Sequence, residues 1–169
     1  LLIKNFNPKI IKTELNFLKK AGANIKLFKD KIHIKGPQKI KSIQNVTTKE
    51  YEGFPTDLAP QFMVLLCKAN GTSSITENIF QGRFLHVMEL QRLGAKITIK
   101  NKTAIIKGKT NFIGAEVMSS DLRASAALVL AGIVAKGKTI ISRVYHCDRG
   151  YENFENKLKK IGVSIKRLK

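Results

Sequence analysis

The sequence contains, twice, a helical segment that is too apolar to lie on a protein surface. Residues 55–75 (PTDLAPQFMVLLCKANGTSSI) and 119–141 (SSDLRASAALVLAGIVAKGKTII) both pass from an Asp-Leu pair into an apolar run that stops at a glycine before a strand. Their leading acids, Asp57 and Asp121, are 64 positions apart. A helix that is apolar on every face must be enclosed by other elements. We therefore expect a fold in which two equivalent helices are buried all round.

A second pattern, an amphipathic helical stretch that ends at a glycine before an alternating strand, occurs three times. The copies are residues 13–27, 88–99 and 154–165. The glycines are placed to end each helix in the left-handed conformation, and they are Gly22, Gly94 and Gly162. In the first two copies a second strand follows closely, at residues 31–35 and 103–107, with Lys-Asp and Asn-Lys at the turns. This spacing predicts two hairpins.

Together these patterns predict an α/β (α+β) fold of pseudo-symmetric units, each of roughly 65 to 70 residues, in which mixed β-sheet covers buried helices. The units are expected to occupy approximately residues 1–80 and 81–145, and a third begins at 146–169. Repeats that cannot bury their faces alone need a full set of neighbours. We therefore expect the chain to be part of one domain of a larger array, with a further strand or more before Leu1.

Composition places the chain among globular proteins that do not span a membrane. An apolar content of 43% excludes a disordered chain, and the longest apolar run, around residues 124–135, is shorter than the roughly 18 to 20 residues of a membrane span. The opening LLIKNFNPKIIK lacks the pattern of a secretory signal. The two cysteines, Cys67 and Cys147, fit a reducing compartment and form no metal-ligand spacing. We expect a cytoplasmic protein without a metal site or cofactor.

The net charge of +19 raises the possibility of nucleic-acid binding. The distribution of the charge argues against it, because residues 51–95 hold only Lys68, Arg83 and Arg92 against four acids, which interrupts any continuous basic stripe. The basic residues are mostly lysine, and a genome poor in G and C would produce the same bias without any nucleic-acid ligand. A nucleic-acid partner is therefore not expected.

A few charged residues stand beside the apolar helices. Asp121 is placed as a helix N-cap, and Arg123 follows it, so the two form either a structural ion pair or part of an anion site. Asp57 also satisfies the position of an N-cap. The run His146-Cys147-Asp148 is expected on a strand, where neighbours point to opposite faces, and so it forms neither a triad nor a metal site.

Four segments carry a resemblance to a known family: GFPTDLAPQF, ITENIFQGRFLHVMEL, SSDLRASAALVLAG and YHCDRGYENFENKL, which lie between residues 53 and 158. Over essentially its whole length the chain resembles the C-terminal portion of the UDP-N-acetylglucosamine enolpyruvyl transferases. The shikimate-pathway enolpyruvyl transferases, which share the fold, are the alternative. The resemblance implies two domains of the inside-out α/β barrel type, each with three pseudo-symmetric units, that close on a cleft. One of these domains would be absent from this chain.

The resemblance also implies an activity, which is transfer of the enolpyruvyl group from phosphoenolpyruvate to the 3-hydroxyl of UDP-N-acetylglucosamine in peptidoglycan synthesis. It implies that Asp57 contacts the sugar nucleotide and is the general base. Ile79 would bind that substrate through backbone and apolar contacts, with Phe80 beside it, although core packing is the ordinary role of such residues. Arg83 would lie near the cleft. Carboxylates suit proton transfer, and arginines suit anion binding.

For phosphoenolpyruvate, the resemblance implies binding by Arg123 and by Arg149, which would also be catalytic, with Asp121 orienting Arg123. The family's other domain supplies a lysine, an asparagine and a mobile loop with a cysteine or an aspartate, and none of these lies in this chain. We therefore expect residues 1–169 alone to bind substrates weakly and to turn over none. A basic anion-binding module on the same fold is the remaining alternative.

Overall fold

The first part of the chain forms a three-stranded sheet and a helix. In the computed structural model, which describes residues 1–168, the elements are β1 (Leu2–Lys4), the 3-10 helix η1 (Pro8–Ile11), α1 (Lys12–Lys20), β2 (Asn24–Leu27) and β3 (Lys31–Lys35). The strands are antiparallel in the order β1-β3-β2. The predicted β2–β3 hairpin is therefore confirmed.

The remainder of the first unit places a helix between two parallel strands. Its elements are β4 (Val46–Thr47), the 3-10 helix η2 (Thr56–Leu58), α2 (Ala59–Cys67) and β5 (Thr72–Thr76). Strand β4 pairs with β5 in parallel, so the chain crosses over through α2. Pro60 lies in the first turn of α2, where its missing amide costs no hydrogen bond.

The second unit repeats this order of elements. It consists of α3 (His86–Arg92), β6 (Lys96–Lys100), β7 (Thr103–Lys107), β8 (Glu116–Met118), α4 (Leu122–Ile133) and β9 (Ile140–Ser142). The predicted β6–β7 hairpin is confirmed, and β7 also pairs with β5, giving the sheet β4-β5-β7-β6 that joins the two units. Strands β8 and β9 are parallel, as β4 and β5 are.

The backbone contacts of the two units correspond position by position. The isolated bridge between Lys41 and Asn70 has its counterpart between Ile113 and Lys136. The amide that follows β4 and the amide that follows β8 donate to the last residue of the parallel partner strand, as Thr48 N–H to Thr76 C=O and as Ser119 N–H to Ser142 C=O. This register makes Thr48 equivalent to Ser119, and it makes the residue after Thr76 equivalent to the residue after Ser142.

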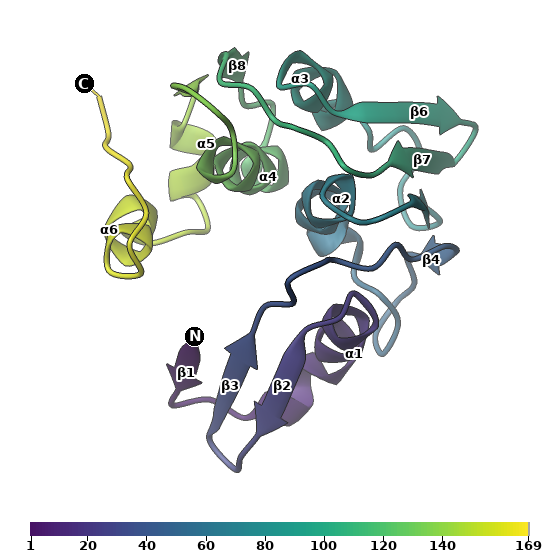
Figure 1. The fold of residues 1–169 in the computed structure, drawn as a ribbon, viewed down its shortest axis with the longest axis vertical. Coiled ribbons are helices and arrows are strands. Elements are labelled where there is room, and N and C mark those ends of the chain that lie inside the picture. The colour runs from purple at the N-terminus through teal and green to yellow at the C-terminus, as the bar shows by residue number, and fades with distance from the viewer. Residues whose placement is uncertain (169) are drawn as a thin grey trace.

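The core lies between the two apolar helices and the sheets around them. Helices α2 and α4 pack side by side at the centre of the molecule, with the β6–β7 hairpin and the β2–β3 hairpin on different sides (Figure 1). Three aromatic rings connect α1 to this core, because Phe17 lies edge-on to Phe54 and to Phe62, with centroids 4.8 and 6.0 Å away. Among the described residues, no helix has the length and apolar character that crossing a bilayer requires.

The expectation that both apolar helices are buried all round is confirmed for α2 and wrong for the end of α4. Leu130 and Ile133 are 36% and 38% exposed, whereas Val64 and Cys67, which lie at the same distance from the end of α2, are buried. Helix α2 is covered there by β5 and β7, which belong to the sheet shared with the second unit. Within residues 1–168, no hairpin pairs with β9 in the same way, so this face of α4 stays open.

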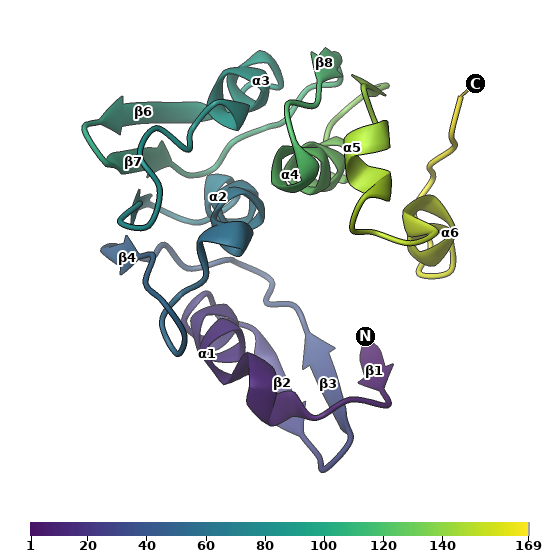
Figure 2. The ribbon, with the colours of Figure 1, turned by 180° about the vertical axis from the view of Figure 1, so that it is seen from behind.

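The last part of the chain departs from two sequence predictions. The segment containing His146 is the single-turn helix α5 (Tyr145–Asp148), where a strand was expected. Helix α6 (Phe154–Lys159) is closed as predicted by Gly162, whose φ is +91° and whose N–H donates to the Lys159 carbonyl oxygen. The strand expected at 163–165 is absent from the described structure, because no neighbouring strand is available to pair with it; Figure 2 shows this segment beyond α6, away from the sheets.

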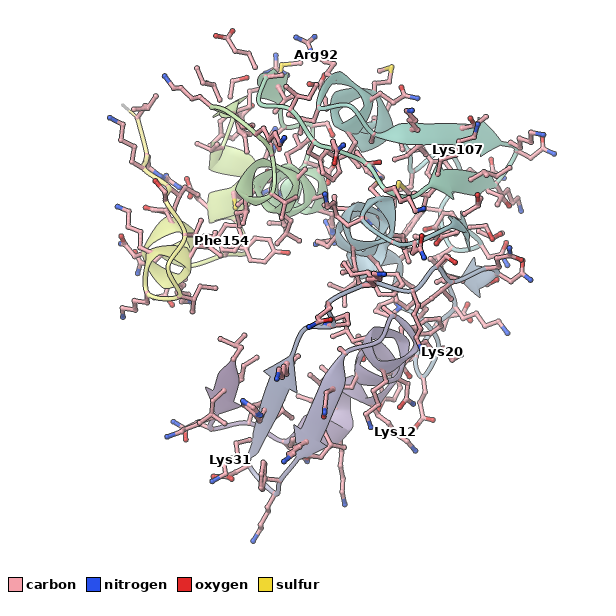
Figure 3. The ribbon with its side chains drawn as sticks, viewed as in Figure 1. Lys12, Lys20, Lys31, Arg92, Lys107 and Phe154 are labelled. Atoms are coloured by element: carbon pink, nitrogen blue, oxygen red, sulfur yellow. The ribbon has the colours of Figure 1, made fainter. Side chains whose placement is uncertain are left out.

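The basic side chains are spread over the surface. Those labelled in Figure 3 lie on separate elements around the periphery: Lys12 and Lys20 on α1, Lys31 on β3, Arg92 on α3 and Lys107 on β7. This arrangement matches the interrupted charge pattern of the sequence.

Candidate active site

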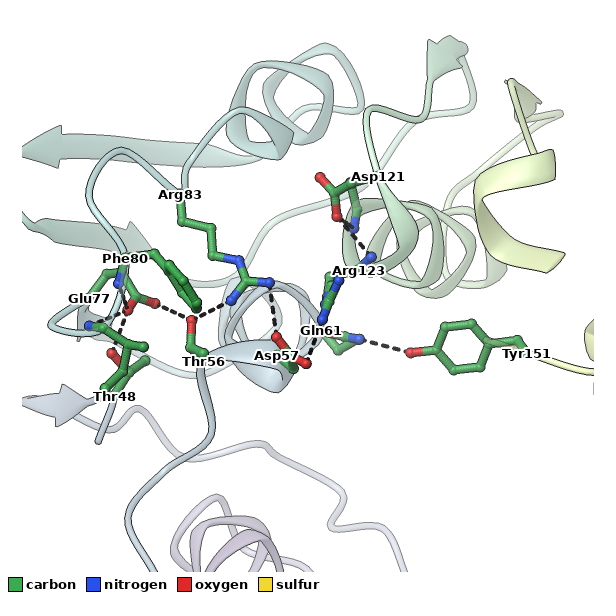
Figure 4. A network of polar contacts seen from close by, with 12 residues as sticks. Thr48, Thr56, Asp57, Gln61, Glu77, Phe80, Arg83, Asp121, Arg123 and Tyr151 are labelled. Atoms are coloured by element: carbon green, nitrogen blue, oxygen red, sulfur yellow. Dashed lines mark hydrogen bonds and ion pairs between the residues drawn. The ribbon is translucent and has the colours of Figure 1, made fainter. Parts of the chain in front are cut away.

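A pocket of about 360 Å³ opens where the starts of α2 and α4 meet the loop that follows β5. The lining residues come mainly from the first unit and are Lys49, Glu50, Pro55, Thr56, Asp57, Ile79, Phe80, Arg83 and Arg123. Four of the residues predicted to contact substrate are therefore brought together here, although they come from three different segments of the chain. Figure 4 shows the polar contacts at this place.

Asp57 lies between two arginines. Its Oδ1 accepts a hydrogen bond from Arg83 Nη2 at 2.9 Å, and its Oδ2 accepts one from Arg123 Nη2 at 2.7 Å (Figure 4). The hydrogen bond from Arg123 is the main cause that lowers the pKa of Asp57, and Arg83 adds to it against the opposing effect of burial. The Asp57 side chain is still 51% exposed, so the pair of arginines and their shared carboxylate remain open to a ligand.

The prediction that Asp57 is a helix N-cap is wrong. A 3-10 turn precedes α2, and neither Pro55 nor Leu58, the two residues in cap positions, makes a side-chain cap bond. The cause is a difference in length between the two units. Nineteen positions separate Thr48 from Cys67, the last residue of α2, but only fourteen separate Ser119 from Ile133, the last residue of α4, so the first unit has five additional residues here. Asp57 therefore lies within the 3-10 turn, and its carboxylate bonds to the two arginines and not to N–H groups of the helix.

Asp121 does cap its helix, as predicted. Its Oδ1 accepts hydrogen bonds from the backbone N–H groups of Arg123 and Ala124, at 2.9 and 3.0 Å. Burial raises the pKa of Asp121, but these bonds and one from the Ser120 hydroxyl outweigh it and lower the pKa. The expectation that Asp121 orients Arg123 needs correction, because the contact is to the Arg123 backbone, while the guanidinium pairs with Asp57.

Replacing the cap gives a stability prediction. We expect Asp121→Ala to lower the free energy of unfolding of the chain by about 1 kcal/mol, because two amides at the start of α4 lose their acceptor. Asp121→Asn keeps a side-chain oxygen and should cost clearly less. Urea unfolding followed by circular dichroism measures both. Equal losses for Ala and Asn would contradict the capping role.

Arg83 is fixed by three neighbours. Besides its bond to Asp57, its Nη1 donates to Thr56 Oγ1 at 2.8 Å, and its guanidinium lies over the Phe80 ring, 4.8 Å from the centroid. Such cation–π contacts are favourable where the cation is partly shielded from water. Phe80 is 53% exposed, so core packing does not explain it. Ile79 is half-buried and lines the pocket, but its N–H is already bonded to Glu77, which leaves its side chain and carbonyl oxygen for a ligand.

Glu77 is a central residue of this site that sequence reasoning missed. It is 4% exposed and accepts four hydrogen bonds. Oε1 accepts from Thr48 Oγ1, Ile79 N and Phe80 N at 2.8, 2.7 and 3.0 Å, and Oε2 accepts from Thr56 Oγ1 at 2.7 Å. Burial raises the pKa of Glu77, but the four donors outweigh it and the pKa is lowered. The only sequence signal was an acid directly after a strand, inside the ITEN segment.

Arg149 is not brought into the pocket. It follows α5, is exposed, and makes no side-chain hydrogen bond or ion pair to any residue that the structure describes. The segment nonetheless approaches the site, because Gln61 Nε2 on α2 donates to the Tyr151 hydroxyl at 3.2 Å (Figure 4). The role of Arg149 in phosphoenolpyruvate binding stays a prediction.

The remaining titratable residues of the last segment do not form a catalytic group. Cys147 is buried and its pKa is raised by burial, while Asp148 faces away and pairs with Arg167 at 2.9 Å. His146 does not converge with them, but the reason is the helical turn and not a strand. Cys67 is fully buried on α2, where burial raises its pKa to about 12. In the described part of the chain, no group of His, Cys, Asp and Glu could hold a metal ion.

Known proteins resemble this chain in sequence. The family model of EPSP synthase (3-phosphoshikimate 1-carboxyvinyltransferase) matches residues 1–158. A UDP-N-acetylglucosamine 1-carboxyvinyltransferase from Pelagibacter ubique (strain HTCC1062) is 56% identical over 168 residues, which are 99% of this chain and 40% of that protein. A protein of the same name from Endomicrobium trichonymphae is 53% identical, over 98% of this chain and 39% of its own length. The chain thus spans about two fifths of the curated relatives it matches.

Solved structures resemble it in fold. The enolpyruvyl transferase NikO from Streptomyces tendae superposes with a TM-score of 0.89 at 24% identity, over 98% of this chain and 39% of that one. An EPSP synthase from Acinetobacter baumannii superposes with a TM-score of 0.66 at 17% identity, over 92% of this chain and 37% of that one. These likenesses confirm the expected fold class, repeated units of buried helices covered by sheet. With the family model matching residues 1–158 and the fold agreeing, the chain belongs to the EPSP synthase (3-phosphoshikimate 1-carboxyvinyltransferase) family.

Proposed function

We propose that this chain is part of a cytoplasmic enzyme that transfers the enolpyruvyl group of phosphoenolpyruvate to the 3-hydroxyl of UDP-N-acetylglucosamine and releases phosphate, the first committed step of peptidoglycan synthesis. The names of relatives at 56% and 53% identity support this substrate pair. The observation that carries the proposal is the carboxylate of Asp57 held between Arg83 and Arg123 in an open pocket.

The reaction needs both a carboxylate that accepts a proton and arginines that bind an anion. The 3-hydroxyl oxygen bonds to C2 of phosphoenolpyruvate, its proton passes to a base, and C3 gains a proton; phosphate then leaves C2 as a proton leaves C3. Asp57 is suited to take the hydroxyl proton, and the arginines are suited to hold the anionic cosubstrate. While Arg123 holds Asp57, the carboxylate is a weak base, because hydrogen bonds to the charged form lower its pKa. An anion that takes Arg123 away would therefore strengthen the base.

The rest of the active site would come from the domain that this chain does not contain. We propose that this domain supplies the lysine, the asparagine and the loop cysteine or aspartate expected from the family resemblance, and that Arg149 completes the anion site when the domains close. The relatives are about two and a half times longer than the matched segment, which leaves room for such a domain.

A hybrid protein tests the proposal. In it, this chain replaces the matched 168 residues of the Pelagibacter ubique relative. We expect the hybrid to release phosphate from phosphoenolpyruvate with UDP-N-acetylglucosamine as acceptor, and residues 1–169 alone to release none. Activity with shikimate 3-phosphate instead would favour the shikimate-type alternative. A folded but inactive hybrid would favour an anion-binding module, and ordinary turnover by the isolated chain would contradict the need for a second domain.

A further inference from the structure

A continuous chain of hydrogen bonds leads from the buried Glu77 to the open pocket. Glu77 Oε2 accepts from the Thr56 hydroxyl at 2.7 Å, and the same hydroxyl oxygen accepts from Arg83 Nη1 at 2.8 Å (Figure 4). Arg83 Nη2 then donates to Asp57, which also accepts from Arg123. Two hydrogen bonds therefore connect the buried Glu77 carboxylate to the Arg83 guanidinium, which in turn holds the candidate base Asp57.

The direction of each bond in this chain is determined by Glu77. An ionised carboxylate only accepts hydrogen bonds, so the single hydroxyl proton of Thr56 must point toward it. The lone pairs of Thr56 then face away and accept from Arg83, whose guanidinium only donates. The other carboxylate oxygen, Oε1, is occupied by the hydroxyl of Thr48 and by two backbone N–H groups, so the carboxylate cannot rotate freely.

The fold does not require this arrangement, because the second unit lacks it. The register of β8 and β9 places Arg143 at the position of Glu77, and Arg143 is exposed. There Ser119, the counterpart of Thr48, forms its hydroxyl contact with Ser125 of α4. Two units with the same backbone connections thus differ at this position. The acid belongs to the unit that carries the pocket.

We propose that Glu77 is a positioning residue, which acts through the Thr56 hydroxyl to hold the Arg83 guanidinium against Asp57 in the geometry that substrates meet. Its catalytic consequence rests on the proposed function, but the positioning itself is a property of the ligand-free chain. Glu77 is enclosed and does not itself line the pocket, so it acts only through the residues that it contacts.

Glu77→Gln tests this with a minimal change of shape. Its carbonyl oxygen must stay with the two backbone N–H groups, so its NH₂ group faces Thr56 and leaves the Thr56 hydroxyl proton without its acceptor. We expect the pKa of Asp57, measured by carbon-13 NMR of the carboxyl in the full chain, to rise because Arg83 is held less well. In the hybrid, kcat/KM should fall about tenfold, as expected for loss of a charge-assisted hydrogen bond.

Two further variants separate positioning from a general structural role. Thr48→Val removes a donor to the other carboxylate oxygen, and it should leave the pKa of Asp57 unchanged. Thr56→Val breaks the link itself and should raise that pKa as Glu77→Gln does. In the Thr56→Val background, Glu77→Gln should change kcat/KM less than about threefold, since the link is already lost. Circular dichroism melts check that each variant is folded.

The outcomes distinguish this inference from the proposed function. An inactive hybrid together with the expected pattern of Asp57 pKa values would overturn the function and leave the positioning role in place. An active hybrid in which Glu77→Gln and Thr48→Val shift the Asp57 pKa equally, or not at all, would overturn the positioning role. So would a full tenfold effect of Glu77→Gln in the Thr56→Val background.

Discussion

Asp57→Asn is expected to reduce the kcat of the hybrid protein by roughly 10²- to 10⁴-fold, the range for loss of a general base. Its affinity for inorganic phosphate is expected to change in the opposite direction. In the ligand-free structure Asp57 is an internal anion that occupies one Nη group each of Arg83 and Arg123. A neutral amide competes less well for these groups, so phosphate should bind about tenfold tighter.

Initial-rate kinetics measures the first effect, and isothermal titration with inorganic phosphate measures the second. Glu50→Gln is the matched control, because Glu50 lines the same pocket and its loss changes the net charge equally, yet it forms no hydrogen bond or ion pair with either arginine in the described structure. Unchanged phosphate affinity in Asp57→Asn would show that Asp57 does not compete with anions. Equal tightening by Glu50→Gln would assign the effect to net charge alone.

The second large effect is expected at Arg123. Arg123→Ala should lower kcat/KM for phosphoenolpyruvate by about a hundredfold, because a guanidinium that pairs with a carboxylate or phosphate is lost. Arg123→Lys should recover only part of this loss, since an ammonium group cannot present two parallel N–H donors. The variant should also change the pH profile. The Arg123 hydrogen bond is the main cause of the lowered Asp57 pKa, so its removal raises that pKa and moves the acid limb of kcat/KM to higher pH.

Arg143→Ala provides the control for Arg123→Ala, because Arg143 is an exposed arginine of the second unit outside the pocket. Arg149→Ala, measured beside it, tests whether Arg149 joins the anion site in the complete enzyme. If Arg123→Ala and Arg149→Ala both left ligand binding intact, while neutralising surface lysines abolished binding to polyanions, the enolpyruvyl transferase proposal would fail.

The sequence was informative where structure depends on local chemistry. Glycines that end helices, hairpin turns and the cap at Asp121 each follow from residues within a few positions of one another, and all were predicted. The strand expected after Gly162 failed because a strand needs a partner, which the described chain does not offer there. The same dependence on neighbours explains the open face of α4 at Leu130 and Ile133.

The membership of the site was predictable in part, and its arrangement was not. Family resemblance named Asp57, Arg83 and Arg123, but no periodicity indicates that one carboxylate spans both guanidinium groups. Glu77 escaped notice because its hydroxyl donors, Thr48 and Thr56, lie 29 and 21 positions away in the sequence. A buried acid is recognised by the donors that surround it, and only the folded chain shows those.

The five additional residues of the first unit also have a meaning for how such a protein can acquire chemistry. A duplicated unit gives one chain two copies of the same arrangement of helix and strands. If one copy keeps only its structural role, the core is preserved while the other copy changes. Here the second unit has the short connection, and its Asp121 caps the helix. The first unit has the longer connection, and its Asp57 pairs with arginines in the pocket. A single polypeptide therefore contains a short and a long form of the same connection, whose properties can be compared directly.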